Sequence, residues 1–408
     1  MYRFLQSLLF SFVILSTSLL HSQTANSFYE AGVQKYKAKD LPGAITEFTN
    51  CVTKNEFFYE AYLERAKCYL DQKKPDAAIK DLTKAISVDV KYYDAYLLRA
   101  NTYILLKQDK NALADFAKAI EIKPSDERAF IARADYYLKT DDLKPATKDL
   151  TQAIQLNDKN AESYYKRGLL NIKLKKENEA LADFTKAITL NDAYTDAYLQ
   201  RIKIYEERRK FQDVITDIIK VLSLGTEDPE IYRERALAYF YTNKYNEALT
   251  DFNSLLVKYN LKDADIFYKR GICYQKTNKT AEALKDFTKV SQMQPQNDSV
   301  CVLLAEIYLA QNKAANALMS YNKAVTINPS CAKAHAGRAK LYMNQNKYQA
   351  AITEFDAAIK NFPEGEWYFM RAECKDQIKD KKGACDDLQS ALSVGYKQAQ
   401  ESINRICK

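Results

Sequence analysis

Residues 93–126 read YDAYLLRANTYILLKQDKNALADFAKAIEIKPSD, and this pattern of residue types recurs along the chain every 34 residues. An arginine at the seventh position marks most copies of the repeat. These arginines are Arg65, Arg99, Arg133, Arg167, Arg201, Arg235, Arg270, Arg338 and Arg371. A fixed period of this length indicates stacked supersecondary units, each in contact with its neighbours. The chain is therefore predicted to be a repeat protein and not a globular enzyme domain.

The period holds from residue 25 to residue 398 and gives eleven repeats. They start at Ala25, Tyr59, Tyr93, Glu127, Ala161, Thr195, Pro229, Ala264, Asp298, Ala332 and Gly365. Small residues such as Ala100 and Ala112 recur at positions 8 and 20, where they allow two helices to approach closely, and large ones such as Phe116 fill the space beside them. Proline near the end of several repeats, for example Pro124, stops the second helix. Each repeat is thus predicted to be a helical hairpin, and the fold class to be all-α.

These residues resemble the tetratricopeptide repeat family. In the third repeat the resemblance lies in Tyr96-Leu97-Leu98-Arg99-Ala100 and, later, in Ala112-Leu113-Ala114-Asp115-Phe116-Ala117-Lys118-Ala119. It covers about nine tenths of the chain, from residue 25 to 398. The resemblance implies a right-handed superhelical solenoid whose first helices line a concave groove that usually binds peptides or protein segments, and it implies no chemistry. Residues 399–408 are expected to form a short C-terminal capping helix.

Residues 1–22 stand outside the repeat. Arg3 precedes an apolar stretch from Phe4 to Leu20, and a cleavage site after Ser22 is plausible from the residues around it. This pattern is typical of an export signal, with an uncleaved membrane anchor as the alternative, since the apolar stretch is short for a membrane span. The repeats are therefore expected to work outside the bacterial cytoplasm, in the periplasm, the cell envelope or the medium.

The sequence offers little for catalysis. It has no glycine-rich phosphate loop, no Gly-x-Ser-x-Gly, no Cys-x-x-Cys and no His-Glu-x-x-His. Of its two histidines, His21 lies in the export segment, and His335 takes a position where other repeats have Tyr or Phe, so we expect it to pack like an aromatic residue. We expect no enzymatic activity, no cofactor, no metal and no small-molecule substrate.

Charge separates two kinds of binding protein. The 61 basic and 53 acidic residues give a formal charge of +8, and the two signs alternate along the helices. This distribution indicates a solvated surface and not a nucleic-acid footprint. A protein or peptide partner is expected, a nucleic-acid-binding helical-repeat protein being the alternative.

An acidic residue follows the recurrent arginine by 16 residues. The expected structural ion pairs are Arg65 with Asp81, Arg99 with Asp115, Arg133 with Asp149 and Arg167 with Asp183. The ninth repeat lacks both partners, having Leu304 and Ser320 instead, while the first has Glu47 without the arginine. We predict a ladder of partly buried pairs that joins the two helices of each hairpin. Binding of a partner by these arginines is the alternative.

The concave face should be lined by positions 2, 5, 6, 9, 12 and 13 of each first helix. The candidate groove residues are Leu63, Lys67, Leu97, Asn101, Ile104, Ile131, Asp135, Leu138, Tyr165, Leu169 and Ile172. Apolar side chains with a few polar ones between them suit an extended or helical segment of another protein. Part of this stripe is expected to serve packing within the repeats.

Two further features concern stability. Cys385 and Cys407 are equally far from Tyr396 in the last turn, so they could form a disulfide, although Cys374 is a competing partner for Cys385. In the sixth repeat Ile202 and Val214 replace the usual small residues. We therefore expect a bend or a preferred opening site over residues 195–290.

Overall fold

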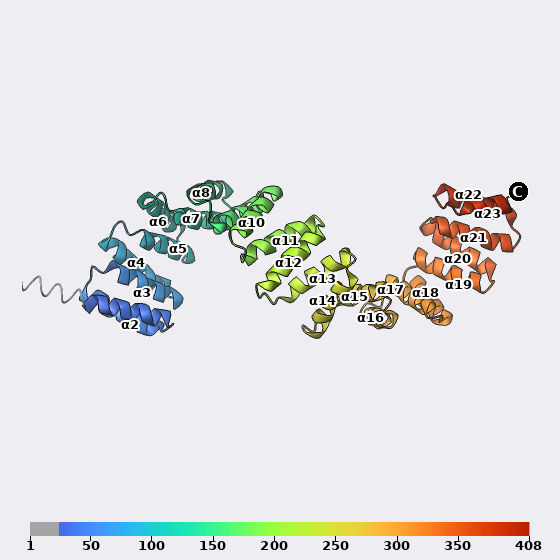
Figure 1. Ribbon diagram of the computed structural model, residues 1–408, viewed down its shortest axis with the longest axis horizontal. Helices are drawn as coiled ribbons and strands as arrows, with labels where there is room; N and C mark the ends of the chain where they lie inside the picture. The colour runs from blue at the N-terminus through green and yellow to red at the C-terminus, as the bar shows by residue number, and fades with distance from the viewer. Residues whose placement is uncertain (1–23, 408) are drawn as a thin grey trace, which may run out of the picture. The chain divides into compact units, whose positions relative to one another are not determined.

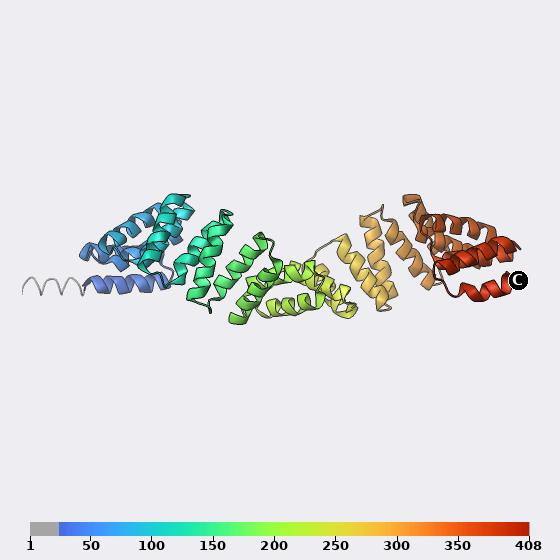
Figure 2. The same cartoon turned by 90° about the horizontal axis from the view of Figure 1, so that it is seen from above.

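The computed structural model describes residues 24–407, and within this range the only regular structure is helical (Figures 1 and 2). None of these helices has the length and apolar character that crossing a membrane requires. The export segment expected at residues 1–22 lies outside the described residues. The chain divides into two compact units, residues 1–204 and 205–408, and each is considered separately below.

The first unit consists of consecutive antiparallel hairpins. Residues 24–37 are helical and precede the first complete helix. The helices that follow are α2 (Leu41–Lys54), α3 (Tyr59–Asp71), α4 (Pro75–Val88), α5 (Tyr93–Leu105), α6 (Asp109–Ile122), α7 (Glu127–Lys139), α8 (Leu143–Leu156), α9 (Ala161–Lys173) and α10 (Glu177–Leu190). Helices α3 and α4, α5 and α6, α7 and α8, and α9 and α10 pair within one repeat. Helix α11 (Thr195–Glu207) contains the division between the units.

The second unit continues the same arrangement. Its helices are α12 (Phe211–Ser223), α13 (Pro229–Tyr241), α14 (Tyr245–Val257), α15 (Ala264–Lys276), α16 (Thr280–Met293), α17 (Asp298–Ala310), α18 (Ala314–Ile327), α19 (Ala332–Asn344), α20 (Tyr348–Asn361), α21 (Gly365–Gln377), α22 (Lys381–Ser393) and α23 (Ala399–Ile406). The short α23 packs against α22. From Tyr59 to Gly365, the first helix of each repeat begins at the residue where the sequence period places the start of that repeat.

The turn inside each hairpin depends on one residue with a positive φ. It stands at position 15 of every repeat, for example Lys107 at 56° and Asn243 at 58°. Four of the last five repeats use asparagine there, namely Asn243, Asn278, Asn312 and Asn346. Asparagine tolerates the left-handed region better than most residues, because its short side chain can bond locally. The chain therefore reverses at a fixed point without glycine.

Small residues let the helices approach as the sequence predicts. A Cβ atom at Gly168 would lie 2.5 Å from the ring of Phe184, and one at Gly271 would lie 2.7 Å from the ring of Phe287. In the sixth repeat, Ile202 and Val214 are only 1% and 0% exposed, so the larger side chains are part of the core. The division between the units falls inside this repeat, and the expected bend stays a prediction.

Candidate functional site

The recurrent arginines bind the aspartates of their own hairpins. Arg65 donates from Nε and Nη2 to the two carboxylate oxygens of Asp81, both at 2.7 Å. The same two-point contact joins Arg99 to Asp115, Arg133 to Asp149 and Arg167 to Asp183, at 2.6 to 2.9 Å. These four aspartates are between 2% and 7% exposed. A charge-assisted pair with this geometry is strong and directional, so it fixes the two helices against each other.

The third nitrogen of several arginines reaches the preceding repeat. Nη1 of Arg65 donates to Thr49 at 3.0 Å, and Nη1 of Arg371 donates to Asp356 at 2.6 Å. Arg99, Arg270 and Arg338 make the equivalent bond to Thr83, Asn253 and Asn322. These arginines thus join three helices. For Arg133 the corresponding residue of the preceding repeat is Ala117, whose side chain has no acceptor. The side chain of Arg133 is 21% exposed, whereas that of Arg65 is 13% exposed.

Repeats without the usual pair replace it in different ways. In the first repeat, Lys35 binds Glu47 at a distance of 2.6 Å. Lys35 lies one helical turn after the position that carries arginine in other repeats. In the ninth repeat, Leu304 is 9% exposed and lies in an apolar cluster. The tenth repeat keeps the pair with glutamate in place of aspartate, and there Arg338 binds Glu354.

His335 does more than pack like an aromatic residue. It is 8% exposed, its Nδ1 lies 2.7 Å from Glu354, and its Nε2 lies 3.0 Å from the carbonyl oxygen of Pro329. Its ring therefore makes a polar bridge as well as filling space. The contact with Glu354 fixes the start of α19 to α20, and the contact with Pro329 fixes it to the loop from the preceding repeat.

The groove residues predicted in repeats two to five differ in accessibility. Leu63, Ile131 and Leu138 are only 6%, 6% and 7% exposed, so they belong to the core and we leave them out of the candidate surface. Lys67, Leu97, Ile104, Asp135, Tyr165 and Leu169 are half-buried. Asn101 is exposed, and Ile172 is 41% exposed. The accessible part of this face is therefore smaller than the sequence pattern predicts.

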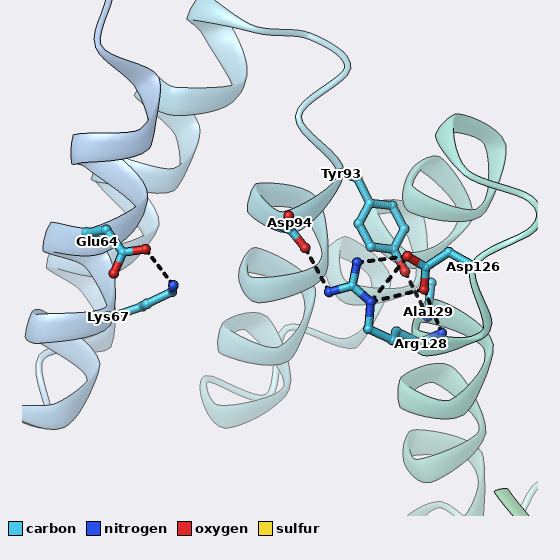
Figure 3. A network of polar contacts seen from close by, with 7 residues as sticks. All are labelled: Glu64, Lys67, Tyr93, Asp94, Asp126, Arg128 and Ala129. Carbon is cyan, nitrogen blue, oxygen red and sulfur yellow. Dashed lines mark hydrogen bonds and ion pairs between the residues drawn. The ribbon is translucent and has the colours of Figure 1, made fainter. Parts of the chain in front are cut away.

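Charged side chains on this face bind one another. Lys67 binds Glu64 at 2.6 Å, and Lys166 binds Asp135 at 2.9 Å. Figure 3 shows the contacts between the third and fourth repeats, where Arg128 binds Asp94 at 3.0 Å and Asp126 at 2.8 Å. Arg128 also lies over the buried ring of Tyr93, whose hydroxyl accepts a bond from the backbone N–H of Ala129. These charges are already paired: the pair of Lys67 with Glu64 lies within α3, while Lys166 with Asp135 and Arg128 with Asp94 join neighbouring repeats.

The corresponding face of the second unit is hollowed. A cavity of about 490 Å³ is lined by Tyr268, Ser299, Val302, Leu303, Glu306, Ser330, Cys331, Ala332, Lys333, Asn361, Phe362 and Trp367. A neighbouring recess of about 290 Å³ shares Tyr268 and Ser299 with it. In the ninth repeat, the lining residues Ser299, Val302, Leu303 and Glu306 are those at positions 2, 5, 6 and 9. Predicted positions thus line part of a cavity in repeats eight to ten, and Trp367 lines it from position 3 of the eleventh repeat, which is not among the predicted positions.

Apolar residues form most of the walls of this cavity. From α17 the cavity is lined by the half-buried Leu303 and by the edge of Val302, which is 6% exposed, and from the start of α21 by Trp367. Trp367 is 4% exposed and packs edge-on against Phe362, with ring centroids 6.2 Å apart. Since side chains from four repeats meet here, the cavity has walls on several sides. Such a setting is typical of a binding site.

Two charged groups at the cavity, Glu306 and Lys333, make no direct ion pair within the described chain. Among the described residues, neither Glu306 nor Lys333 has a hydrogen-bond or ion-pair partner at bonding distance, whereas Lys340 nearby binds Glu366 at 2.9 Å. The side chain of Glu306 is reached by solvent, yet the protein around it desolvates the carboxylate and raises its pKa, against the opposing effect of Lys333 and Lys340. A partly desolvated carboxylate is stabilised when a cation binds to it.

A larger recess of about 670 Å³ lies elsewhere, over α8 in the first unit. Seven of its eight lining residues belong to that one helix, Leu174 being the other. It is therefore a trough along an exposed helix, bordered mainly by threonine, glutamine and lysine. We favour the cavity of repeats eight to eleven as the candidate site.

The sequence contains a signal for this cavity that the repeat average hides. Repeats nine to eleven depart from the common pattern, with Cys301, Leu304 and Ser320 in the ninth, His335 in the tenth and the only tryptophan, Trp367, in the eleventh. Position 3 is alanine in many repeats, so Trp367 is unusual there. Of these unusual residues, Trp367 is the one that lines the cavity.

The cysteines are structural in character. Cys385 and Cys407 form a disulfide across the last turn, with their Cα atoms 5.6 Å apart, and Cys374 is a buried free thiol. Burial raises the pKa of Cys374 to about 11 and that of Cys273 to about 12, so neither is an activated nucleophile. Within residues 24–407, no group of three or more His, Cys, Asp or Glu side chains is placed to hold a metal ion.

Comparisons with known proteins agree with the repeat architecture. Three family models described as tetratricopeptide repeat match residues 59–91, 93–126, 161–194, 233–298 and 308–374, which together make up more than half of the chain. No curated protein matches the sequence.

Many solved structures are similar to parts of the chain. A crystal structure of YrrB, described as a TPR protein with an unusual peptide-binding site, is 22% identical, with a TM-score of 0.40 over 45% of this chain and 95% of that one. A tetratricopeptide repeat protein from Parabacteroides merdae is 20% identical, with a TM-score of 0.43 over 61% and 99%. Yeast Tom70 is 17% identical, with a TM-score of 0.38 over 94% and 96%.

Proposed function

Since the chain belongs to the tetratricopeptide repeat family, we propose that it is a non-enzymatic interaction scaffold that binds a peptide or protein segment on the first helices of repeats eight to eleven. The observation that carries the proposal is the cavity between Tyr268, Val302, Leu303 and Trp367. It combines apolar walls with a few polar groups, as peptide-binding grooves do.

The recurrent arginines are already bound within the chain, which supports partner binding at the cavity and not at the arginine–aspartate pairs. The aspartates that hold the arginines are buried inside the hairpins, and the third nitrogen of several arginines is used by the preceding repeat. A partner would have to break these bonds in order to reach the guanidinium groups. Breaking a buried pair from one side costs about 3 to 5 kcal/mol, which a surface contact does not return.

We further propose that the protein works after export, in the periplasm, the cell envelope or the medium. The apolar stretch after Arg3 supports this, and so does the disulfide between Cys385 and Cys407, because such bonds persist in oxidising compartments. Fractionation of the native cells, followed by non-reducing peptide mapping of the protein, would test it. Recovery from the cytoplasm with both cysteines reduced would contradict it.

Selection of peptides from a display library on the purified protein tests the binding role. Leu303 faces the cavity, and Leu98 stands at the same position of the third repeat, so Leu303→Glu and Leu98→Glu form a matched pair. The proposal expects the selected peptides to lose binding to the Leu303→Glu protein and to keep it with Leu98→Glu. The reverse result, or equal binding to both variants, would place the site elsewhere.

A further inference from the structure

The acids on the first helices around the cavity differ in their surroundings. Asp265 binds Lys269, and Glu366 binds Lys340 at 2.9 Å, so these two carboxylates are neutralised within the chain. Glu306 lies between them along the repeats and has no such partner among the described residues. It is therefore the acid at this site that remains open to a cation from outside the chain.

The position of Glu306 on α17 places it beside the apolar wall. Val302 and Leu303 lie four and three residues before it, so the three side chains share one face of the helix. All three line the same cavity as Trp367 and Phe362. A single segment of a partner can consequently contact the apolar wall and the carboxylate together.

We infer that the cavity takes a segment of a partner protein that inserts an apolar side chain between α17 and Trp367 and places a lysine or arginine against Glu306. The inference rests on the proposed function and names the chemistry of its partner. The surrounding protein already desolvates Glu306, and for that reason an incoming cation restores an interaction that water supplies only in part.

Lys333 does not reverse this preference. It lies on the first turn of α19, and its side chain is exposed. A lysine ammonium is strongly hydrated and stands on a flexible stem, so it can move aside when a cation enters. An acidic segment bound through Lys333 is the competing outcome that the experiment must detect.

Trp367 provides a direct probe, because it is the only tryptophan among the 408 residues. The full-length protein would be titrated with short blocked peptides in which two leucines flank one variable position, occupied in turn by arginine, lysine, glutamine or glutamate. We expect the arginine and lysine peptides to shift the tryptophan emission and to bind about tenfold more tightly than the glutamine peptide, as a charge-assisted bond in a partly desolvated site gives. The glutamate peptide should bind most weakly.

Variants of the protein connect this preference to one carboxylate. Glu306→Gln should remove the difference between the arginine and glutamine peptides, and Glu306→Lys should favour the glutamate peptide. Glu282→Gln, the same change at an exposed site on α16, should behave like the unmodified protein. Unchanged melting would show that each variant is folded.

The outcomes separate the inference from the proposed function. If all four peptides bind equally, or if the preference survives in Glu306→Gln, the inference fails while peptide binding in the cavity stands. Tighter binding of the glutamate peptide to the unmodified protein would also overturn the inference, in favour of Lys333. If no peptide changes the emission, the proposed function fails at this site.

Discussion

The first helices of repeats two to five and those of repeats eight to eleven use the same positions in opposite ways. In the first region Lys67 binds Glu64 within α3, and Lys166 binds Asp135 of the preceding repeat, so the charges at the surface are paired within the chain. In the second region Glu306 and Lys333 line a cavity and find no partner within the described chain. One repeat pattern thus yields a self-contained face in one unit and an open one in the other.

The comparison separates two sets of residues. The arginine–aspartate pairs inside the hairpins, called the framework below, recur in both regions, while the residues at groove-facing positions vary. The pairs of Arg133 with Asp149 and of Arg270 with Asp286 have the same geometry in the two units. The residues at some groove-facing positions vary between repeats, for example Asn101, Asp135 and Glu306 at position 9. Stability should therefore respond equally to changes of the framework in both regions, while binding should respond in one region alone.

The largest effect is expected from the framework. Arg133→Ala leaves the buried Asp149 without its counter-charge and should destabilise the hairpin of α7 and α8 by about 3 kcal/mol. Arg270→Ala should cost a similar amount in the other unit. Native-state hydrogen exchange of the two hairpins measures both.

A double change provides the control for this prediction. Arg133→Ala combined with Asp149→Ala should recover part of the loss, since no charge is then stranded. Absence of coupling between the two sites would contradict the structural role of the pair. It would reopen the possibility that these arginines bind a partner.

The second effect is confined to the end of the second unit. Cys407→Ser removes a disulfide that closes a segment of 22 residues and should destabilise α21 to α23 by about 2 to 3 kcal/mol. Because α21 supplies Trp367, peptide affinity should fall as well. Hydrogen exchange should leave α5 to α8 unchanged, and equal loss of protection in both regions would show that the effect is not local.

A smaller effect separates packing from binding. Leu98→Ala and Leu303→Ala remove half-buried side chains at the same repeat position, and each should cost about 1 kcal/mol. Only Leu303→Ala should also weaken the leucine–arginine peptide, by about tenfold. Melting curves and Trp367 emission measure the two quantities, and an equal loss of binding in both variants would remove the distinction between the regions.

The smallest expected effect is a change in stability that has opposite signs for Glu306→Gln and Asp135→Asn. Desolvation raises the pKa of Glu306, so this carboxyl keeps its proton to a higher pH in the folded state than in the unfolded state. The ionised Glu306 therefore lowers the stability of the fold as the pH rises above the usual pKa of glutamate. Glu306→Gln should therefore stabilise slightly at neutral pH, by less than about 0.5 kcal/mol because solvent reaches the side chain, and should do nothing in acid.

Asp135→Asn is the matched change at position 9 of the fourth repeat. It breaks the pair with Lys166 and should destabilise by a similar small amount. Urea titrations at neutral and acidic pH test both variants. If both substitutions shift stability in the same direction, the contrast between a paired and an open acid is wrong.

The framework was readable from the sequence because it repeats. A period of 34 residues fixed the hairpins, and the 16-residue interval predicted the pairs of Arg65 with Asp81 and of Arg99 with Asp115. The additional bond from Arg65 to Thr49 was not foreseen, since the residue at that position varies between repeats. Periodicity reveals what many repeats share and is silent about contacts that only some of them make.

The cavity was harder to predict for the same reason. A cavity forms where side chains fail to fill the space between helices, which depends on distances that spacing in the chain does not give. Leu63, Ile131 and Leu138 are covered by their neighbours, and Val302 is equally buried at 6% exposure, whereas the half-buried Leu303 and the exposed Glu306 line open space. The cysteine alternatives likewise required the geometry of the last turn, which joins Cys385 to Cys407.

The most direct measurement is to locate a bound peptide by photo-crosslinking. The leucine–arginine peptide, with one leucine replaced by a photoreactive diazirine analogue, would be irradiated with the full-length protein and the attachment sites mapped by mass spectrometry. The account predicts attachment to α17 and α21, at Val302, Leu303 or Trp367. Attachment to α5, at Leu97, Asn101 or Ile104, would contradict it and return the binding site to the first unit.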